Sequence, residues 1–337
     1  MLVSAIVSGL IAVMASILNF GVWSLVIYNV SYQFIQTVLL VRLYAFNYRG
    51  KLDHIFLKEA VVYSWKLMLS GLIHTVYENI FNIIMGSLFS VSALGYYSNA
   101  LKIRDGAAQT LTDAIQKVSF PVLSKLQDKK DSMLETSRRI LKLSIFIIYP
   151  ILIGLAATSE SIVKVVFNEQ WLGMIPIMQI LAINGLLIPL HKVNLNILTV
   201  IGRTDLYLRL EIIKKIVAFI TISIALLVGV TLEGLLWVLF INAVLGYIIN
   251  VHYSKVFIGY GYIDQIKDIS PITIVSIMMG VLVYLCSYID ISTLLLLVLQ
   301  IGVGALSYIV LSYFFLKTEF NDVMNIIKSM VRRIKRK

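Results

Sequence analysis

Long apolar segments, separated by short polar or charged turns, follow one another along the whole chain of 337 residues. Each is about 20 residues long, the length that an α-helix needs to cross roughly 30 Å of hydrocarbon. The ten predicted spans are 1–18, 22–43, 60–89, 92–122, 140–157, 175–201, 212–230, 235–251, 272–289 and 293–316. Strands are not expected, because an open sheet cannot satisfy its backbone in lipid and no ten-residue alternating segments appear. The pattern predicts an all-α polytopic membrane helix bundle with about ten transmembrane helices.

The basic residues follow a regular alternation between these spans. They gather after spans two, four, six and eight and in the tail, whereas the intervening loops contain only Lys164. This interpretation assigns Arg138 and Arg139 to the loop after span four, and Lys214 and Lys215 to the loop after span six. Because basic loops stay in the cytoplasm, we expect both termini to be cytoplasmic.

Composition agrees with a membrane protein and excludes several other classes. Hydrophobic residues make up 59% of the chain and charged residues 14%, against roughly 25% charged in soluble domains. The formal net charge is +11, but the basic residues lie between apolar runs and not on a soluble surface, so no nucleic-acid partner is expected. The single cysteine, Cys286, excludes an intrachain disulfide and a cysteine metal site.

Catalytic and cofactor motifs are missing from the sequence. The four histidines are scattered without metal-ligand spacing. The chain contains no phosphate-binding loop, nucleophile elbow or dinucleotide-binding glycine pattern. We therefore expect no cofactor, no metal and no enzymatic activity. Transport, if the chain performs it, would be driven by ion or substrate gradients.

The fourth predicted span is unusually polar, and its polar residues recur every three or four positions. They are Ser98, Lys102, Asp105, Gln109, Asp113 and Gln116. Because this spacing places them on one helix face, the stripe predicts a hydrophilic transport cavity in which Lys102 and Arg104 bind an anionic group. The alternative is internal pairing, of Asp113 with Lys117 and of Asp105 with Lys102 or Arg104.

The third predicted span has its own polar face, with His74 and Glu78 one turn apart. A histidine beside a carboxylate is typical of a proton- or sodium-coupling site. In the alternative interpretation, these groups hydrogen-bond the basic residues of span four.

The sixth predicted span combines polar residues with two prolines. His191 and Lys192 lie near Pro189, with Pro176 nearer the start of the span. A proline-broken helix beside polar groups often lines a substrate path. The alternative is a helix that nears the cytoplasmic interface, where Lys192 extends to the headgroups.

The tail, residues 319–337, alternates apolar and basic positions. Its apolar residues Phe320, Val323, Ile326, Ile327 and Val331, with basic residues between and after them, suit a short helix that lies on an anionic cytoplasmic leaflet. A frayed basic tail that only fixes the topology is the other possibility.

Five short segments carry a resemblance to a known family. They are GVWSLV at 21–26, MGSLFSVSALGYYSNALKIRD at 85–105, VSFPVLSKLQDK at 118–129, IVKVVFNEQW at 162–171 and IGRTD at 201–205. Their order and spacing resemble the polysaccharide and O-antigen (lipid-linked oligosaccharide) flippases of the multidrug/oligosaccharidyl-lipid/polysaccharide exporter superfamily. Members of that family have twelve or fourteen helices, with two six-helix lobes that rock to give alternating access.

The resemblance implies a division of the chain. Residues 1–45 would be the last two helices of the amino-terminal lobe, and 46–59 a cytoplasmic linker. Residues 60–256 would form the complete second lobe, 257–316 an additional helix pair and 317–337 the basic tail. The first four helices of the family pattern would then be missing. Either the sequence is a fragment, or the gene is truncated, or another polypeptide supplies the remaining helices.

The resemblance also implies a function: flipping of undecaprenyl-diphosphate-linked oligosaccharide across the bacterial cytoplasmic membrane for surface polysaccharide assembly. The expected partners are this lipid-linked oligosaccharide, membrane lipids and polysaccharide-assembly proteins. The substrate-binding candidates are Lys102, Arg104, Asp105, Gln109, His191 and Lys192, and the ion-coupling candidates are His74 and Glu78. The alternatives are a multidrug or metabolite exporter, a polysaccharide polymerase and a non-transporting scaffold.

Overall fold

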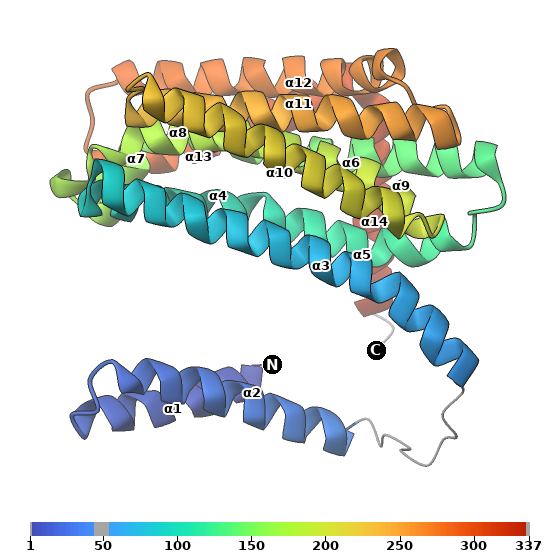
Figure 1. Cartoon of the computed structure of the whole chain (residues 1–337). Helices are drawn as coiled ribbons and strands as arrows, with labels where there is room; N and C mark the ends of the chain where they lie inside the picture. Colours follow the sequence, from blue (N-terminus) through green and yellow to red (C-terminus); the bar gives the residue numbers. More distant parts are fainter. Residues whose placement is uncertain (1, 44–53, 335–337) are drawn as a thin grey trace. The chain divides into compact units, whose positions relative to one another are not determined.

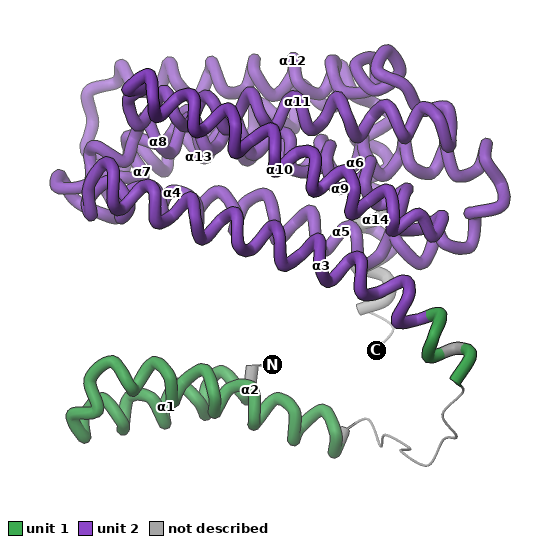
Figure 2. Tube along the Cα trace, viewed as in Figure 1, with its two compact units in different colours: residues 1–59 green, residues 60–337 purple. Residues whose placement is uncertain are grey.

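The computed structural model describes residues 2–43 and 54–334, and the regular elements in these ranges are all helices (Figure 1). The chain divides into two compact units, Met1–Glu59 and Ala60–Lys337 (Figure 2). Most of the predicted linker 46–59 and the last three tail residues lie outside the described ranges. The two units are treated separately below.

The first unit is a helical hairpin. Helix α1 (Leu2–Ile17) packs against α2 (Trp23–Leu43). The turn between them uses positive φ angles at Asn19 (62°) and Gly21 (52°), a conformation that asparagine and glycine tolerate best. The hairpin coincides with the first two predicted spans.

The second unit contains the remaining predicted spans. Its long helices are α3 (His54–Ile84), α4 (Val91–Ala107), α5 (Gln109–Ser124), α6 (Lys130–Ala157), α8 (Met174–Gly185), α9 (Leu187–Val200), α10 (Thr204–Leu227), α11 (Leu232–Ile258), α12 (Tyr262–Leu285), α13 (Thr293–Phe315) and α14 (Lys317–Ile334). The short elements are η1 (Met85–Phe89), α7 (Ser159–Ile162), η2 (Val163–Phe167), η3 (Glu169–Trp171) and η4 (Cys286–Tyr288).

Within the described ranges, six helical stretches are long and apolar enough to cross a membrane: α2, α6, α8 with α9, α11, α12 and α13. The other predicted spans are also helical but less suited by these measures. Helix α1 has 16 residues, and α3, α4 with α5, and α10 carry the polar residues described below. The all-α, multi-pass architecture is therefore confirmed, and membrane crossing by these four remains a prediction.

Two loop assignments are wrong. Arg138 and Arg139 lie inside α6, and Lys214 and Lys215 lie inside α10. Helix α6 begins at Lys130 instead of 140, which places Arg138 and Arg139 inside it. Helix α10 begins at Thr204 instead of 212, and Lys214 and Lys215 fall within the predicted span itself. Hydropathy marks where the apolar core of a helix begins, whereas backbone hydrogen bonding continues through the charged turns that precede it.

Predicted spans four and six are each interrupted. Span six consists of α8 and α9, which meet at Leu186. Pro189 explains this interruption, because it has no N–H for the carbonyl of Gly185 and its ring crowds that carbonyl. Pro176 lies in the first turn of α8, where proline is tolerated. Span four is divided into α4 and α5 at Ala108.

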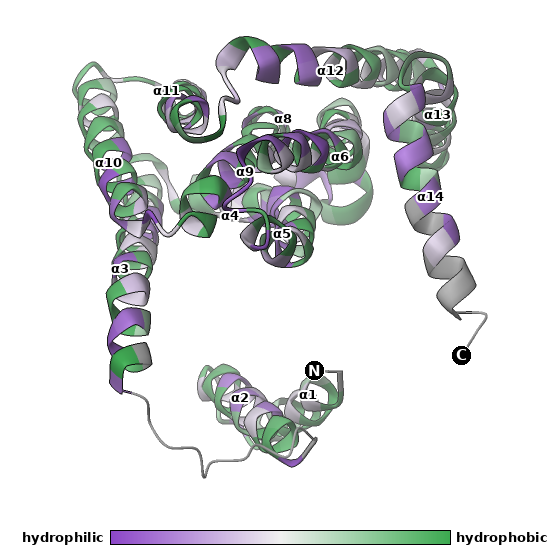
Figure 3. Ribbon diagram, turned by 90° about the vertical axis from the view of Figure 1, so that its right-hand side faces the viewer, coloured by the Kyte–Doolittle hydropathy of each residue, from purple (hydrophilic) through white to green (hydrophobic). Residues whose placement is uncertain are grey.

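Apolar packing forms two main cores in the second unit. One contains Leu152, Met178 and Leu181, and the other contains Ile145 and Tyr149. The outward faces of the helices are also apolar, which Figure 3 shows for α11 and α13. An apolar exterior around a packed interior is the arrangement expected of a lipid-embedded bundle.

Helices α6 and α12 approach each other closely at Gly280. A Cβ at this position would lie 2.5 Å from Cγ2 of Ile153, whereas a Cβ at Gly302 on α13 would contact nothing within 4 Å. Small residues at such crossings let membrane helices pack closely. We expect Gly280→Ala to destabilise the protein by about 1–3 kcal/mol through overpacking. Thermal unfolding in detergent measures this, and Gly302→Ala is the matched control, which should not lower the transition temperature.

Candidate functional site

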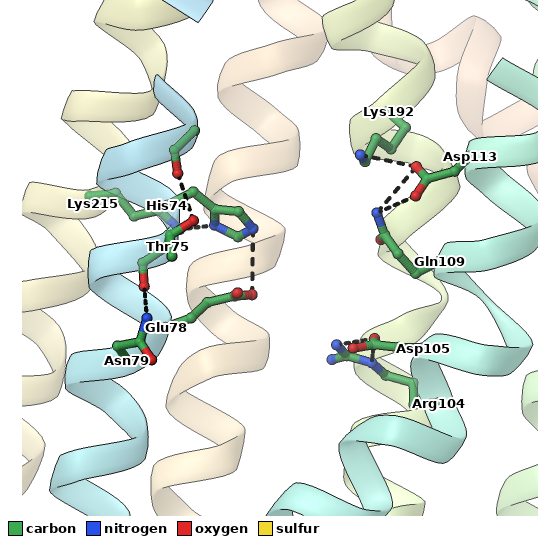
Figure 4. A network of polar contacts seen from close by, with 11 residues as sticks. His74, Thr75, Glu78, Asn79, Arg104, Asp105, Gln109, Asp113, Lys192 and Lys215 are labelled. Atoms are coloured by element: carbon green, nitrogen blue, oxygen red, sulfur yellow. Dashed lines mark hydrogen bonds and ion pairs between the residues drawn. The ribbon is translucent and has the colours of Figure 1, made fainter. Parts of the chain in front are cut away.

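Polar side chains of the second unit gather on α3, α4, α5, α9 and α10 (Figure 4). Two groups can be distinguished. One lies on α3 and α10, and the other on α4, α5 and α9. In Figure 4 the side chains of the two groups point toward one another.

Asp113 on α5 is the centre of the second group. Its carboxylate accepts hydrogen bonds from Nζ of Lys192 on α9 (3.2 Å) and from Nε2 of Gln109 one turn earlier (3.2 Å). Helices α5 and α9 pack side by side, so Lys192 reaches the carboxylate across the interface. The predicted pairing of Asp113 with Lys117 is wrong: Lys117 is exposed, and the partner comes from another helix.

Arg104 and Asp105 form an ion pair at the end of α4. Nε and Nη2 of Arg104 both donate to Oδ1 of Asp105, at 2.9 and 2.6 Å. The stem of Arg104 runs against Gly185, where a Cβ would lie 3.1 Å from Cγ of the arginine. The predicted alternative of an Asp105–Arg104 pair is confirmed.

Lys102, one turn earlier, is exposed. Among the described residues, none forms a hydrogen bond or ion pair with its ammonium group. Lys102 therefore remains available to an anion that approaches α4 from outside.

The first group is centred on His74. Its Nε2 lies 3.4 Å from Oε1 of Glu78 on the same helix, and its Nδ1 lies 3.2 Å from Nζ of Lys215 on α10. The ammonium of Lys215 also lies over the ring of Tyr77, 4.0 Å from the centroid. The interpretation that His74 and Glu78 bind basic residues of span four is wrong for the described contacts, since their basic partner is on α10.

Next to Lys215, α10 also carries a buried ion pair. Lys214 and Glu211 pair one turn apart, with side chains only 14% and 11% exposed. Gly246 on α11 makes room for this pair, because a Cβ there would lie 3.1 Å from Cδ of Lys214 and 3.2 Å from Cε1 of His191. A buried carboxylate and ammonium are tolerated only when they neutralise each other.

His191 lies apart from the other predicted site residues. Its Nδ1 is 3.0 Å from Nδ2 of Asn250, and its ring meets Tyr247 edge-on. Both contacts are on α11, whereas the next residue, Lys192, reaches α5. Successive residues on a helix point about 100° apart, which separates these neighbours in sequence.

The structure therefore pairs Arg104 with Asp105, brings Gln109 and Lys192 together at Asp113, and places His74 and Glu78 opposite (Figure 4), whereas Lys102 joins neither contact among the described residues. It adds Glu211, Lys214 and Lys215, which hydropathy alone assigned to a loop or left aside. Their signal was available in the sequence, because three charges within five positions directly precede and enter an apolar run.

Comparison with known proteins identifies the family. Residues 1–176 match the family model described as polysaccharide biosynthesis protein. This chain belongs to that family. The teichuronic acid biosynthesis protein TuaB of Bacillus subtilis is 31% identical over 137 residues, which cover 41% of this chain and 28% of TuaB.

Two further relatives match a larger share of the chain. The lipopolysaccharide biosynthesis protein WzxC of Escherichia coli is 27% identical, over 60% of this chain and 41% of WzxC. The succinoglycan biosynthesis transport protein ExoT of Rhizobium meliloti is 21% identical, over 80% of this chain and 52% of ExoT. The matched region spans about half or less of the length of these curated relatives.

The fold also matches a solved structure, the lipid II flippase MurJ in an inward closed conformation. The TM-score is 0.68 at 16% identity, over 95% of this chain and 67% of MurJ. This match confirms an all-α polytopic membrane bundle. The structural match, the apolar helices and the relatives together identify this chain as a multi-pass protein of the bacterial inner membrane.

The Asp113–Lys192 contact can be tested by a double-mutant cycle of Asp113→Asn and Lys192→Gln. Because the side chains are 43% and 38% exposed, solvent screening should limit their coupling to about 0.2–1 kcal/mol, decreasing with salt. Thermal unfolding in detergent at two ionic strengths measures the coupling. The matched cycle of Asp113→Asn with Lys117→Gln should give none. A larger coupling to Lys117 than to Lys192 would contradict the structure.

Proposed function

We propose that this chain takes part in translocating an undecaprenyl-diphosphate-linked oligosaccharide across the inner membrane for surface polysaccharide assembly. The observation that carries the proposal is the cluster of charged side chains on helices of a flippase-like bundle. Charges at membrane depth are costly and are typical of substrate or ion paths. The names of the relatives support the substrate class, since they refer to teichuronic acid, lipopolysaccharide and succinoglycan biosynthesis and to a lipid II flippase.

The charge balance of the site suits an anionic headgroup. Apart from the Glu211–Lys214 pair, which is neutral as a whole, the two groups contain four cations, Lys102, Arg104, Lys192 and Lys215, and three carboxylates, Glu78, Asp105 and Asp113. Because the carboxylates neutralise most of the cations, the site carries a small positive excess rather than a strong field. A diphosphate can replace the carboxylates as the partner of these cations when it binds. Because the carboxylates can pair with the cations again, the diphosphate is not held too tightly to be released.

Lys102 and Arg104 are the proposed diphosphate ligands. Lys102 is exposed, and Arg104 uses Nε and Nη2 on Asp105, which leaves Nη1 for a further acceptor. A guanidinium binds phosphate oxygens through several fixed N–H groups, whereas an ammonium acts as a point charge. The lipid tail would stay in the bilayer while these groups hold the headgroup.

The other candidates receive secondary roles. Asp105, Gln109 and Lys192 would bind sugar hydroxyl or acidic groups on the same face. His191, held by Asn250 and Tyr247, would stabilise the α9–α11 contact from which Lys192 extends.

His74 and Glu78 are the proposed coupling groups. A proton on His74 would place a second cation beside Lys215, 3.2 Å away, and draw Glu78 closer. Protonation would thus redistribute charge along the α3–α10 contact, which can favour one of two helix arrangements.

The alternative functions fit these features less well. An exporter of organic cations would need an acidic site, and the balance here is slightly positive. A polymerase would be expected to have a large external loop with catalytic groups, and the predicted external loops of this chain are short. A scaffold would bind other polysaccharide-assembly proteins without translocation.

The headgroup role predicts that Lys102→Ala combined with Arg104→Ala, introduced into the native gene, abolishes transport. Surface polysaccharide should decrease at least tenfold while the protein level in the membrane stays unchanged. Lys117→Ala is the matched control, because it removes an exposed cation from the adjoining helix. Surface polysaccharide at the normal level in the double variant would refute the role of Lys102 and Arg104.

The coupling role predicts that Glu78→Gln makes transport insensitive to a proton or sodium gradient. Transport of fluorescent lipid-linked oligosaccharide into proteoliposomes, with and without an imposed gradient, measures this. Asn79→Ala on the same helix is the control, because within the described ranges the Asn79 side chain donates to the carbonyl of Thr75 on its own helix and to no other helix. Equal stimulation by the gradient in the wild type and in Glu78→Gln would exclude Glu78 as a coupling group.

A further inference from the structure

The carboxy-terminal helix α14 follows directly after the apolar helix α13. The last turn of α13 exposes Tyr313, Phe314 and Phe315 by 58–67%, and such aromatic residues concentrate at the membrane interface. Leu316 ends α13, and α14 starts at the next residue, Lys317. Figure 3 looks along the bundle and shows α14 lengthwise, whereas α11 is seen nearly end-on. Helix α14 therefore runs crosswise to the bundle, beside α6.

Two acidic residues in the first half of α14 are paired with α6. Nε and Nη2 of Arg139 donate to the two carboxylate oxygens of Asp322, at 3.0 and 2.8 Å. Nζ of Lys142 lies 3.2 Å from Oε1 of Glu319. The bidentate arginine contact fixes geometry as well as charge.

These contacts are anchored to α12 through a third carboxylate. Arg138 donates two hydrogen bonds of 2.9 Å to Asp268, and Lys142 lies 3.5 Å from the same group. The hydroxyl of Tyr260 also donates to Asp268, at 2.8 Å. Burial, and then the bond to this carboxylate, raises the pKa of Tyr260, so the donor keeps its proton. The start of α14 is thus held by a network from three segments.

Beyond Asp322 the chain contains no further acidic residue but six basic ones: Lys328, Arg332, Arg333, Lys335, Arg336 and Lys337. Phe320 and Val323 pack against the second core. In the sequence, Ile327 and Val331 follow Val323 at intervals of four residues, the spacing of one helix face. A helix with one apolar side and basic residues elsewhere lies in the plane of an anionic membrane surface.

We propose that α14 binds the surface of the cytoplasmic leaflet through anionic phospholipid headgroups, and that Arg139 and Lys142 permit this by neutralising Asp322 and Glu319. Without these partners, two uncompensated carboxylates would lie in the first half of α14, and their repulsion from an anionic surface would oppose the attraction of the basic second half. The lipid surface is the favoured occupant because its charge complements that of the helix and because the aromatic end of α13 sets the depth at which α14 starts. The proposal does not depend on what the protein transports.

The test uses the full chain in nanodiscs of phosphatidylcholine, with or without 30% phosphatidylglycerol. In a Cys286→Ser background, an environment-sensitive fluorophore is attached at Ile327→Cys, on the apolar side, or at Asn325→Cys, on the opposite side. With phosphatidylglycerol, the probe at 327 should shift to the blue and its quenching by iodide should decrease at least threefold. The probe at 325 should remain quenched in both lipids, and 0.5 M salt should reverse the effect.

Charge variants test the part played by α6. Arg139→Gln with Lys142→Gln should remove the effect of phosphatidylglycerol at position 327. Lys125→Gln with Lys129→Gln, which removes the same charge before α6, should keep it. Adding Asp322→Asn and Glu319→Gln to the first pair should restore the lipid response, which distinguishes loss of neutralisation from unfolding.

The outcomes are decisive. A probe at 327 that is protected equally in both lipids would mean that protein contacts alone hold α14. A probe that is quenched in both would mean that α14 does not bind the membrane. Either result overturns the proposal. The proposal also fails if the variant with all four substitutions has an unchanged thermal transition but does not recover the phosphatidylglycerol response at position 327.

Discussion

A charged group inside a membrane loses its hydration, and the arrangement of the second unit follows from the need to replace it. Asp113 meets Lys192, Asp105 meets Arg104 and Glu211 meets Lys214. The buried Glu211–Lys214 pair supplies the hydrogen bond and opposite charge that water would otherwise provide, whereas the partly exposed Asp113 and Asp105 keep part of their hydration. Because Lys192 comes from a different helix than Asp113, this pairing also determines which helix faces can pack together. The polar groups thus act as constraints on the bundle as well as elements of a site.

Close helix packing accommodates these groups at particular glycines. Arg104 passes Gly185, and Lys214 with His191 occupies the space beside Gly246. A side chain at either glycine would push against the charged stem. Gly280 likewise leaves room for a neighbouring side chain, here an apolar one, since it lets α12 approach Ile153 of α6. Where membrane helices lack a hydrophobic drive to associate, such close contacts supply the dispersion energy.

A neutral polar network connects α12 to the rest of the unit. The side-chain amides of Asn194 and Gln265 bond each other at 2.8 and 3.1 Å, Ser254 donates to Asn194, and Tyr247 donates to Gln265. Together with the Arg138–Asp268 contact, these bonds hold α12 to α6, α9 and α11. The helix pair α12–α13 therefore belongs to the same packed body as the site and should move with it.

Much of this architecture follows from the sequence alone. The lengths of the apolar runs determine helices, because only helices satisfy their own backbone in lipid, and Pro189 explains where one of them is interrupted. Periodicity also predicted that Lys102, Asp105, Gln109 and Asp113 share a face, although the structure divides this segment into α4 and α5. Whether Asp113 pairs with Lys117 or Lys192, and whether His74 meets α4 or α10, could be decided only by the tertiary structure. Helical spacing defines neighbours within one helix, whereas the partner across an interface depends on which helices pack together and at what height.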